Sequence, residues 1–264
     1  PRLLGWRAAT RVCQESAVIA KPELALAMRG LTPHGVDTDP RTLLGEIASA
    51  GYRSVQLDIT HPALRPRGLD RSARRDLGAL LRRLGLRLSG LDLFIPPEHF
   101  AKSEHVDRAV EAAKQGLSLA EDLVALQAGD GVVSLALPEQ LAEGVAGTLA
   151  SASESRGVRV ADHAWPRNPR MGIEVGLDPA AVLAHGGDVV AAAATGLAAA
   201  RLNDLGSGGR IEPGSRGGRL DGEAYSATLV TFGFKGAVVA DLLGVVGPMA
   251  AAKRVLAWWG GKGQ

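Results

Sequence analysis

Aspartate residues close most of the apolar runs in this 264-residue chain. Asp162, Asp178, Asp204 and Asp241 each stand at the end of a largely apolar run, and Asp92 lies near the end of another. Carboxylates can transfer protons or bind a cation, and an apolar surrounding can raise the pKa of one of them until it serves as a general acid. An aspartate at such a position can equally cap the loop or helix that follows. Each position therefore has both a chemical and a structural interpretation.

Arginines accompany the later aspartates. Arg201 lies within the run that ends at Asp204, and Arg210 and Arg216 follow in the glycine-rich segment GSGGRIEPGSRGGRLD. Several guanidinium groups on a flexible backbone can close over an anionic or polyhydroxyl ligand. The same segment is also typical of a mobile surface loop with solubilising charges.

Two further segments place polar or aromatic side chains after apolar runs. His163 and Trp165 follow Asp162, and the segment PPEHF contributes Glu98 and His99. These four residues are candidates for contact with a substrate, with Trp165 suited to stacking on a sugar ring. Their structural alternatives are a hydrogen-bonding histidine, a rigid connector and a turn that leads into a helix.

The apolar runs alternate with helical patterns along the chain. Strands that alternate with helices indicate a parallel sheet with right-handed crossovers, and eight of them favour a closed barrel. The expected strands are residues 23–28, 54–59, 86–95, 132–138, 158–162, 172–178, 200–204 and 237–241. The expected helices are residues 41–50, 72–84, 104–123, 139–155, 188–197, 221–232 and 245–258.

Only nine residues, HAWPRNPRM, separate the fifth and sixth expected strands, which is too few for a full crossover helix. The sequence therefore predicts an α/β fold, a (β/α)8 TIM barrel with a shortened or missing helix between strands 5 and 6. Residues 23–264 form the single barrel domain in this prediction, and residues 1–22 form an amino-terminal arm. Because the carboxyl ends of parallel strands meet at one edge, the aspartates should gather there.

Composition narrows the function classes. Aromatic residues make up 4% of the chain and the formal net charge is +2, with arginines scattered among acids, which argues against nucleic acid as a partner. No apolar run reaches the roughly 18 residues of a membrane helix, so no membrane partner is expected. The single cysteine, Cys13, favours a reducing cytoplasm. Trp258 and Trp259 suit either the outer surface of the barrel or a contact in a homo-oligomer.

Five segments carry a resemblance to a known family: GYRSVQLD, LRRLGLRLSGLDL, LASASESRGVRVADHAW, VGLDPAAVLAHGGD and ARLNDLGSGGRIEPGSRGGRLDGEAYSATLVTFGFKGAVVAD. In order and spacing they resemble the xylose isomerase-like TIM barrels, the sugar phosphate isomerase/epimerase group, over residues 24–243. The resemblance implies a divalent metal ion (Mn, Mg or Zn) at the strand ends, which polarises sugar oxygens while carboxylates move a proton between carbons.

The metal ligands implied by the resemblance fall on Asp162, Asp178 and Asp241, whereas its two histidine positions fall on Ala181 and Arg201. Arginine stays protonated in proteins and cannot bind a metal ion. The departure predicts that Arg201 ion-pairs with Asp162, Asp178 or Asp241 and replaces the metal electrostatically.

Several functions fit these residues. The first hypothesis is an enzyme, an isomerase or epimerase of a sugar or sugar phosphate, with Asp162, Asp178, Asp241 and Arg201 in the chemistry. The second is a barrel without turnover that binds a carbohydrate or a protein partner, which the lost histidine positions favour. A lyase or hydrolase on the same scaffold stays open, because a fold does not determine a reaction.

Overall fold

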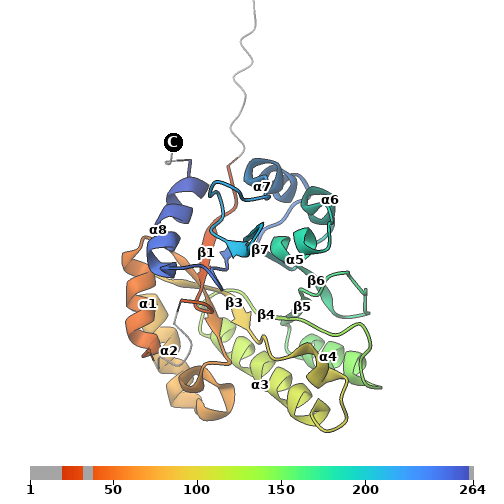
Figure 1. The fold of residues 1–264 in the computed structure, drawn as a ribbon. Helices are drawn as coiled ribbons and strands as arrows, with labels where there is room; N and C mark the ends of the chain where they lie inside the picture. Colours follow the sequence, from red (N-terminus) through yellow and green to blue (C-terminus); the bar gives the residue numbers. More distant parts are fainter. Residues whose placement is uncertain (1–19, 32–37, 262–264) are drawn as a thin grey trace, which may run out of the picture.

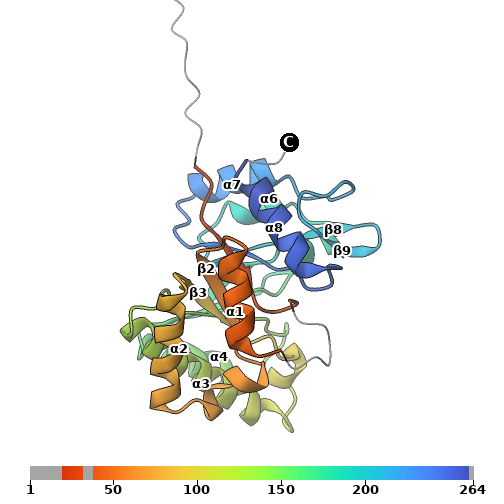
Figure 2. The same cartoon turned by 90° about the vertical axis from the view of Figure 1, so that its left-hand side faces the viewer.

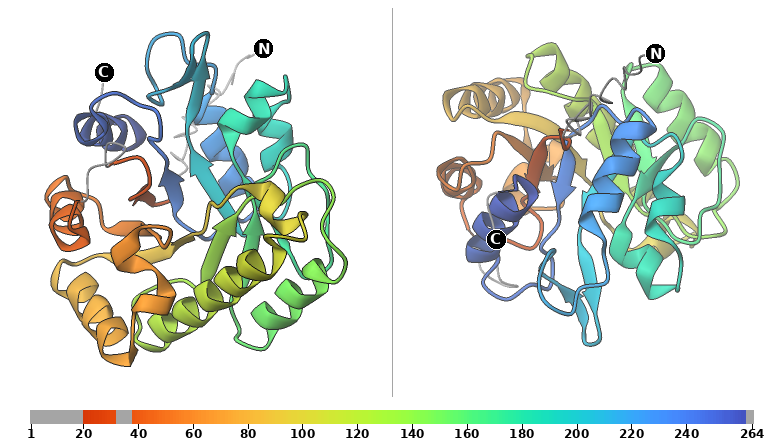
Figure 3. Two further views of the ribbon diagram at one scale, coloured as in Figure 1. Left: turned by 60° about the horizontal axis from the view of Figure 1, so that its bottom comes forward. Right: turned by 90° about the horizontal axis from the view of Figure 1, so that it is seen from above.

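The protein is a closed barrel of parallel strands surrounded by helices, seen in a computed structural model that describes residues 20–31 and 38–261 (Figures 1 and 3). Within these residues eight strands close the ring in the order β1-β10-β7-β6-β5-β4-β3-β2. They are β1 (Leu24–Ala27), β2 (Ser54–Asp58), β3 (Arg87–Asp92), β4 (Val132–Leu135), β5 (Arg159–Asp162), β6 (Glu174–Leu177), β7 (Ala199–Leu202) and β10 (Val238–Ala240). The predicted (β/α)8 barrel is confirmed.

The helices follow the strands as the alternating pattern predicts. They are α1 (Pro40–Ser49), α2 (Arg71–Arg83), α3 (Val106–Ala125), α4 (Val145–Glu154), α5 (Pro179–Ala184), α6 (Val189–Ala193), α7 (Gly222–Thr231) and α8 (Pro248–Trp259), with 3-10 turns η1 (Pro62–Leu64), η2 (Pro66–Gly68) and η3 (Pro97–Phe100). No helix stands between β5 and β6 in the described chain, as predicted from the short connection. The prediction for residues 188–197 was incomplete, because two short helices, α5 and α6, fill the space before β7.

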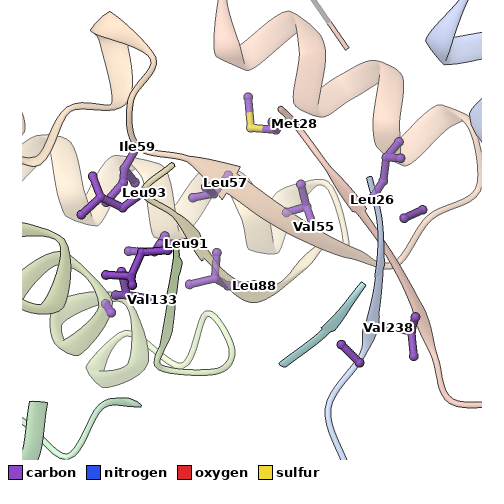
Figure 4. Packing of buried hydrophobic residues seen from close by; sticks show 14 of the residues in the cluster. Leu26, Met28, Val55, Leu57, Ile59, Leu88, Leu91, Leu93, Val133 and Val238 are labelled. Carbon is purple, nitrogen blue, oxygen red and sulfur yellow. The ribbon is translucent and has the colours of Figure 1, made fainter. Parts of the chain in front are cut away.

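The two faces of the strands differ in size and polarity. Leucine and valine side chains from β2, β3 and β4 point outward and pack on the helices, as Leu57, Leu91 and Val133 do in Figure 4. Small side chains such as Ala25, Ala27 and Val239 form a separate cluster on the other face. Because side chains alternate along a strand, the polar Gln56 faces the barrel interior, while its neighbours Val55 and Leu57 face outward. The barrel interior thus combines small apolar residues with a few large polar ones.

A glycine makes room for one of these polar side chains. The pairing of β2 with β3 shifts by one residue between Val55 and Gln56, opposite Gly90. Gly90 has a φ of 151°, and a Cβ there would stand 2.9 Å from Gln56 Oε1 and 2.8 Å from the Val132 carbonyl oxygen. Glycine is therefore required for the buried amide of Gln56 to enter the interior.

An antiparallel hairpin follows β7. Its strands are β8 (Asp204–Gly206) and β9 (Gly209–Ile211), so the predicted strand 200–204 divides after Leu202 and part of the predicted flexible loop is ordered. Figure 2 shows the hairpin next to α8, where Arg254 Nε donates to Glu212 Oε1 at 2.8 Å. This hairpin carries Arg210 toward the strand ends.

In the described part of the chain, no helix is both long and apolar enough to cross a membrane. The predicted arm, residues 1–22, lies outside the described residues apart from its last three, and its role stays a prediction.

Candidate functional site

Arg201 is the centre of the candidate site. It lies on β7, its side chain is 1% exposed, and it is the largest fully buried side chain among the described residues. Its Nη2 donates to Asp92 Oδ1, and its Nη1 donates to Asp241 Oδ2 at 3.2 Å. The predicted ion pair with Asp241 is therefore present, and Asp92 is a partner that was not predicted.

A second arginine continues the ion pairs toward the surface. Arg210 Nη1 donates to Asp241 Oδ2 at 3.3 Å, and its Nη2 donates to Asp178 Oδ2 at 2.7 Å. Asp178 also caps α5, since its Oδ1 accepts from the Ala181 amide at 3.1 Å. The side chain of Arg210 is 27% exposed, against 9% for Asp178 and 1% for Asp241. Arg210 is therefore the member of this set that an incoming ligand meets first.

A network of hydrogen bonds between uncharged side chains contacts Asp92 inside the barrel. Gln56 Nε2 donates to Asp92 Oδ1 at 2.9 Å and to Ser134 Oγ at 3.2 Å, while Ser89 Oγ donates to Gln56 Oε1 at 2.9 Å. His163 Nε2 shares a hydrogen bond of 3.1 Å with Ser134 Oγ. The amide of Gln56 thus contacts the same oxygen, Asp92 Oδ1, that Arg201 contacts, and it helps to hold the carboxylate in that orientation.

Burial controls the protonation of the central groups. It raises the pKa of Asp92, although the Arg201 charge works in the opposite direction. For Arg201, burial lowers the pKa but the carboxylates of Asp92, Asp241 and Asp178 outweigh it, so the guanidinium stays charged. Burial and then the Arg201 charge bring the pKa of His163 well below its ordinary value, so this imidazole is neutral at pH 7.

An aromatic ring lies beside the buried arginine. The guanidinium carbon of Arg201 is 4.6 Å from the centre of the Phe94 ring, and that of Arg29 is 4.1 Å from the same ring. Cations attract the face of an aromatic ring. Phe94 therefore brings Arg29, which follows β1, next to the central ion pairs.

Asp162 does not join this set. Its Oδ2 accepts from Arg170 Nη1 at 2.8 Å, and its Oδ1 accepts from the amides of Leu137 and Ala164, both at 3.0 Å. Of the three alternatives predicted as partners of Arg201, Asp162 is not used, because Arg170, in the connection that lacks a helix, supplies its guanidinium. Burial raises the pKa of Asp162.

The remaining predicted residues are spread over several places. Asp204 Oδ1 accepts from the amides of Leu205 at 2.7 Å and of Arg219 and Leu220 at 2.9 Å, which ties the hairpin to the chain before α7. Trp165 lies 5.4 Å from the Arg167 guanidinium.

The rings of His99 and His105 lie in contact at a tilt of 48°, with centres 4.5 Å apart, while Glu98 and Arg216 are exposed. Their predicted roles in substrate binding stay predictions, because none of these residues contacts the central ion pairs.

Comparisons with known proteins identify the fold. No family model matches the chain, and no curated protein matches it. Among solved structures it is similar to a xylose isomerase domain protein from Alicyclobacillus acidocaldarius subsp. acidocaldarius, with a TM-score of 0.66 at 18% identity over 91% of this chain and 98% of the other. The chain has the xylose isomerase-like TIM barrel fold.

Other solved structures of this fold are also similar. A D-psicose 3-epimerase with D-tagatose from Clostridium cellulolyticum H10 gives a TM-score of 0.64 at 13% identity, over 90% of this chain and 98% of the other. A sugar phosphate isomerase/epimerase from Parabacteroides distasonis gives 0.59 at 14% identity, over 93% and 96%. The structural neighbours are thus sugar isomerase/epimerase-like barrels, and the resemblance in the sequence is confirmed at the level of the fold.

The residues of this xylose isomerase-like barrel do not fit the metal ion that the family implies. Asp162 is held by Arg170, whereas Asp178 and Asp241 are bridged by Arg210. In the described chain no group of three or more His, Cys, Asp or Glu side chains could hold a metal ion. A guanidinium occupies the space between the carboxylates that a cation would need.

The sequence interpretation missed several members of the site. Gln56, Ser134 and Phe94 come from three different strands or strand ends, and none has a motif of its own. Asp92 was among the aspartates singled out in the sequence, but its contact with Arg201 was not predicted. The missing information was register, which decides which strand-end side chains face inward.

Proposed function

We propose that this chain binds a sugar or sugar phosphate at the carboxyl-terminal mouth of its barrel, with arginine side chains in the place of a metal ion. The observation that carries the proposal is the buried guanidinium of Arg201 between Asp92 and Asp241. The similar structures, which include sugar epimerases, support the substrate class.

The charges of the site explain how arginine can replace a divalent ion. Three carboxylates, Asp92, Asp178 and Asp241, converge on the guanidinium groups of Arg201 and Arg210. Two guanidinium groups carry the same total charge as one divalent cation, and they offer N–H donors instead of empty coordination positions. Two of the three negative charges are thus compensated without metal, and a cation added between the carboxylates would meet electrostatic repulsion from both arginines.

The groups nearest the surface suit a polyhydroxyl or phosphorylated ligand. The partly exposed Arg210 can donate to a sugar hydroxyl or, in bidentate fashion, to a phosphate. Phe94 offers an apolar ring, and Arg29 adds a second guanidinium beside it. Of these side chains Arg201 is too deeply buried for direct contact, so its part is to hold Asp241 in position.

Calorimetric titration with D-tagatose and with D-fructose 6-phosphate, in EDTA and again in Mn²⁺, tests this proposal. We expect binding of one of the two that is unchanged by EDTA. Arg210→Gln should weaken it about tenfold, equivalent to about 1.4 kcal/mol, whereas Arg83→Gln, an exposed arginine on α2, should leave it unchanged. Binding that appears only with Mn²⁺, or no binding of either probe, would contradict the proposal.

A second candidate function is turnover, namely isomerisation or epimerisation of the bound sugar. The exposed side of the Arg210–Asp178 ion pair favours it, because a ligand that engages Arg210 would release Asp178 Oδ2 to accept a proton. Chromatography of D-fructose incubated with the protein would reveal a new ketohexose, which Asp178→Asn should abolish. Unchanged D-fructose together with tight sugar binding would support the binding function alone.

A further inference from the structure

A cavity of about 480 Å³ lies outside the barrel wall, between the ends of β2 and β3, the turn η2 and helix α3. Its apolar floor is formed by Ile59, Leu93 and Ile95. Figure 4 shows Ile59 and Leu93 next to each other on this side of the strands. The volume lies in the range of small-molecule sites, about 300–1,000 Å³.

This cavity is separate from the mouth of the barrel. Leu93 and Ile95 line the cavity, whereas Asp92 and Phe94 contact Arg201. The alternation of side chains along an extended segment sends the two pairs to opposite faces. A ligand in the cavity therefore would not touch the central ion pairs.

Arginines form the rim of the cavity. Arg67 makes no ion pair or hydrogen bond with its side chain within the described residues, and Arg65 uses only its Nε, which donates to the Thr60 carbonyl at 3.2 Å. Arg108 Nη2 shares a hydrogen bond of 2.8 Å with His105 Nδ1. The rim thus has guanidinium donors to spare.

The acids on the rim do not cancel this charge. Glu111 accepts from Gln115 Nε2 at 2.9 Å and lies 3.4 Å from Lys114 Nζ, so its charge is already compensated. Asp107 is exposed at the start of α3. Three arginines against these two acids leave a positive rim above an apolar floor.

We propose that this cavity binds a small amphipathic carboxylate, with the apolar part of the ligand on Ile59, Leu93 and Ile95 and its carboxylate at Arg67. The apolar floor contributes through the area that it removes from water. The guanidinium of Arg67 is well suited to a carboxylate because its paired N–H groups match the two oxygens. Neither feature requires the sugar site at the mouth.

Calorimetric titration with octanoate, and with octan-1-ol as the uncharged analogue, tests the proposal on the full chain. We expect one octanoate per chain, with octan-1-ol at least about tenfold weaker, a difference of about 1.4 kcal/mol. Arg67→Gln should reduce octanoate affinity about tenfold, while Arg75→Gln, an exposed arginine on α2, should not change it.

Two further variants separate loss of the cavity from loss of the fold. Ala112→Phe should fill the cavity and abolish octanoate binding, and its thermal unfolding will show whether the barrel is intact. Arg210→Gln should bind octanoate like the parent protein, because Arg210 lies at the mouth. Octanoate binding that survives in a folded Ala112→Phe variant, that is lost in Arg210→Gln, or that octan-1-ol matches would overturn the proposal, as would absence of octanoate binding.

Discussion

Replacing Arg201 by methionine is the sharpest perturbation of this barrel. The change removes the cation between two carboxylates that are 0% and 1% exposed, while an unbranched apolar side chain remains in place of the arginine stem. Asp241 retains its contact with Arg210 at 3.3 Å. Asp92 retains only the hydrogen bond from the Gln56 amide to its Oδ1, while its Oδ2 is buried and has no partner. The cost of Arg201→Met should therefore fall mainly on Asp92.

Removing one partner of a buried ion pair costs about 3–5 kcal/mol, and we expect a loss of unfolding free energy in this range at pH 7. For a chain of this size each kcal/mol lowers Tm by about 2–4 °C, so Tm should fall by about 6–20 °C. Burial already raises the pKa of Asp92, and loss of the opposing Arg201 charge raises it further. The penalty is present above that raised pKa and declines as the pH falls and Asp92 takes up a proton.

Urea unfolding followed by circular dichroism measures the effect, and the double variant Arg201→Met with Asp92→Asn is the control. Removing the stranded charge should restore about 1–3 kcal/mol, the coupling expected of residues in direct contact. A loss below about 1 kcal/mol for the single variant, or no recovery in the double variant, would refute the view that Arg201 neutralises Asp92.

Three other perturbations test the surroundings of the site. Asp204→Ala leaves three backbone amides without an acceptor and should cost about 1–3 kcal/mol in urea unfolding; a neutral effect would show that the hairpin does not depend on it. Gly176→Ala places a Cβ 2.5 Å from the His163 ring and should cost about 1–3 kcal/mol, with partial recovery when His163 is also replaced by alanine; no recovery would contradict the packing argument. Burial raises the pKa of Asp162 above 3.8, so the folded state binds its proton more tightly than the unfolded state does. The stability of the parent protein relative to Asp162→Asn should therefore fall as pH rises from 3.8 through the raised pKa, and then level off. A stability difference that rises with pH would contradict this direction.

The barrel itself could be predicted because the relevant signals are local. Each strand is a short apolar run and most helices have an apolar face, so the alternation is visible in the sequence alone. The short HAWPRNPRM connection likewise predicted the missing helix. The helix α5 was not predicted, because its six residues, from Pro179 onward, are too few to show a helical repeat of apolar residues.

The site could be predicted only in part. Arg201 was singled out because a guanidinium stands where the family resemblance implies a histidine, and its contact with Asp241 follows from the pairing of β7 with β10, two neighbouring strands. Its other contact, with Asp92, crosses the barrel interior from β3. Such a contact depends on strand register and on the space left by Gly90, which no local pattern encodes.

The partner of Asp162 also could not be predicted from its position in the sequence. Its position at the end of β5 predicted a place among the central carboxylates, but Arg170 lies only eight residues further along the chain and reaches it first. Arg201 in turn is held by Asp92 and Asp241. The cytoplasmic location and the homo-oligomer stay predictions.

Crystals grown in millimolar MnCl2 and measured at the manganese absorption edge give the most direct test of the central claim, which is that Arg201 and Arg210 stand in for a metal ion. The account predicts electron density for both guanidinium groups between Asp92, Asp178 and Asp241, and no anomalous peak among these carboxylates. An anomalous peak within coordination distance of Asp178 and Asp241, with Arg210 displaced, would contradict it.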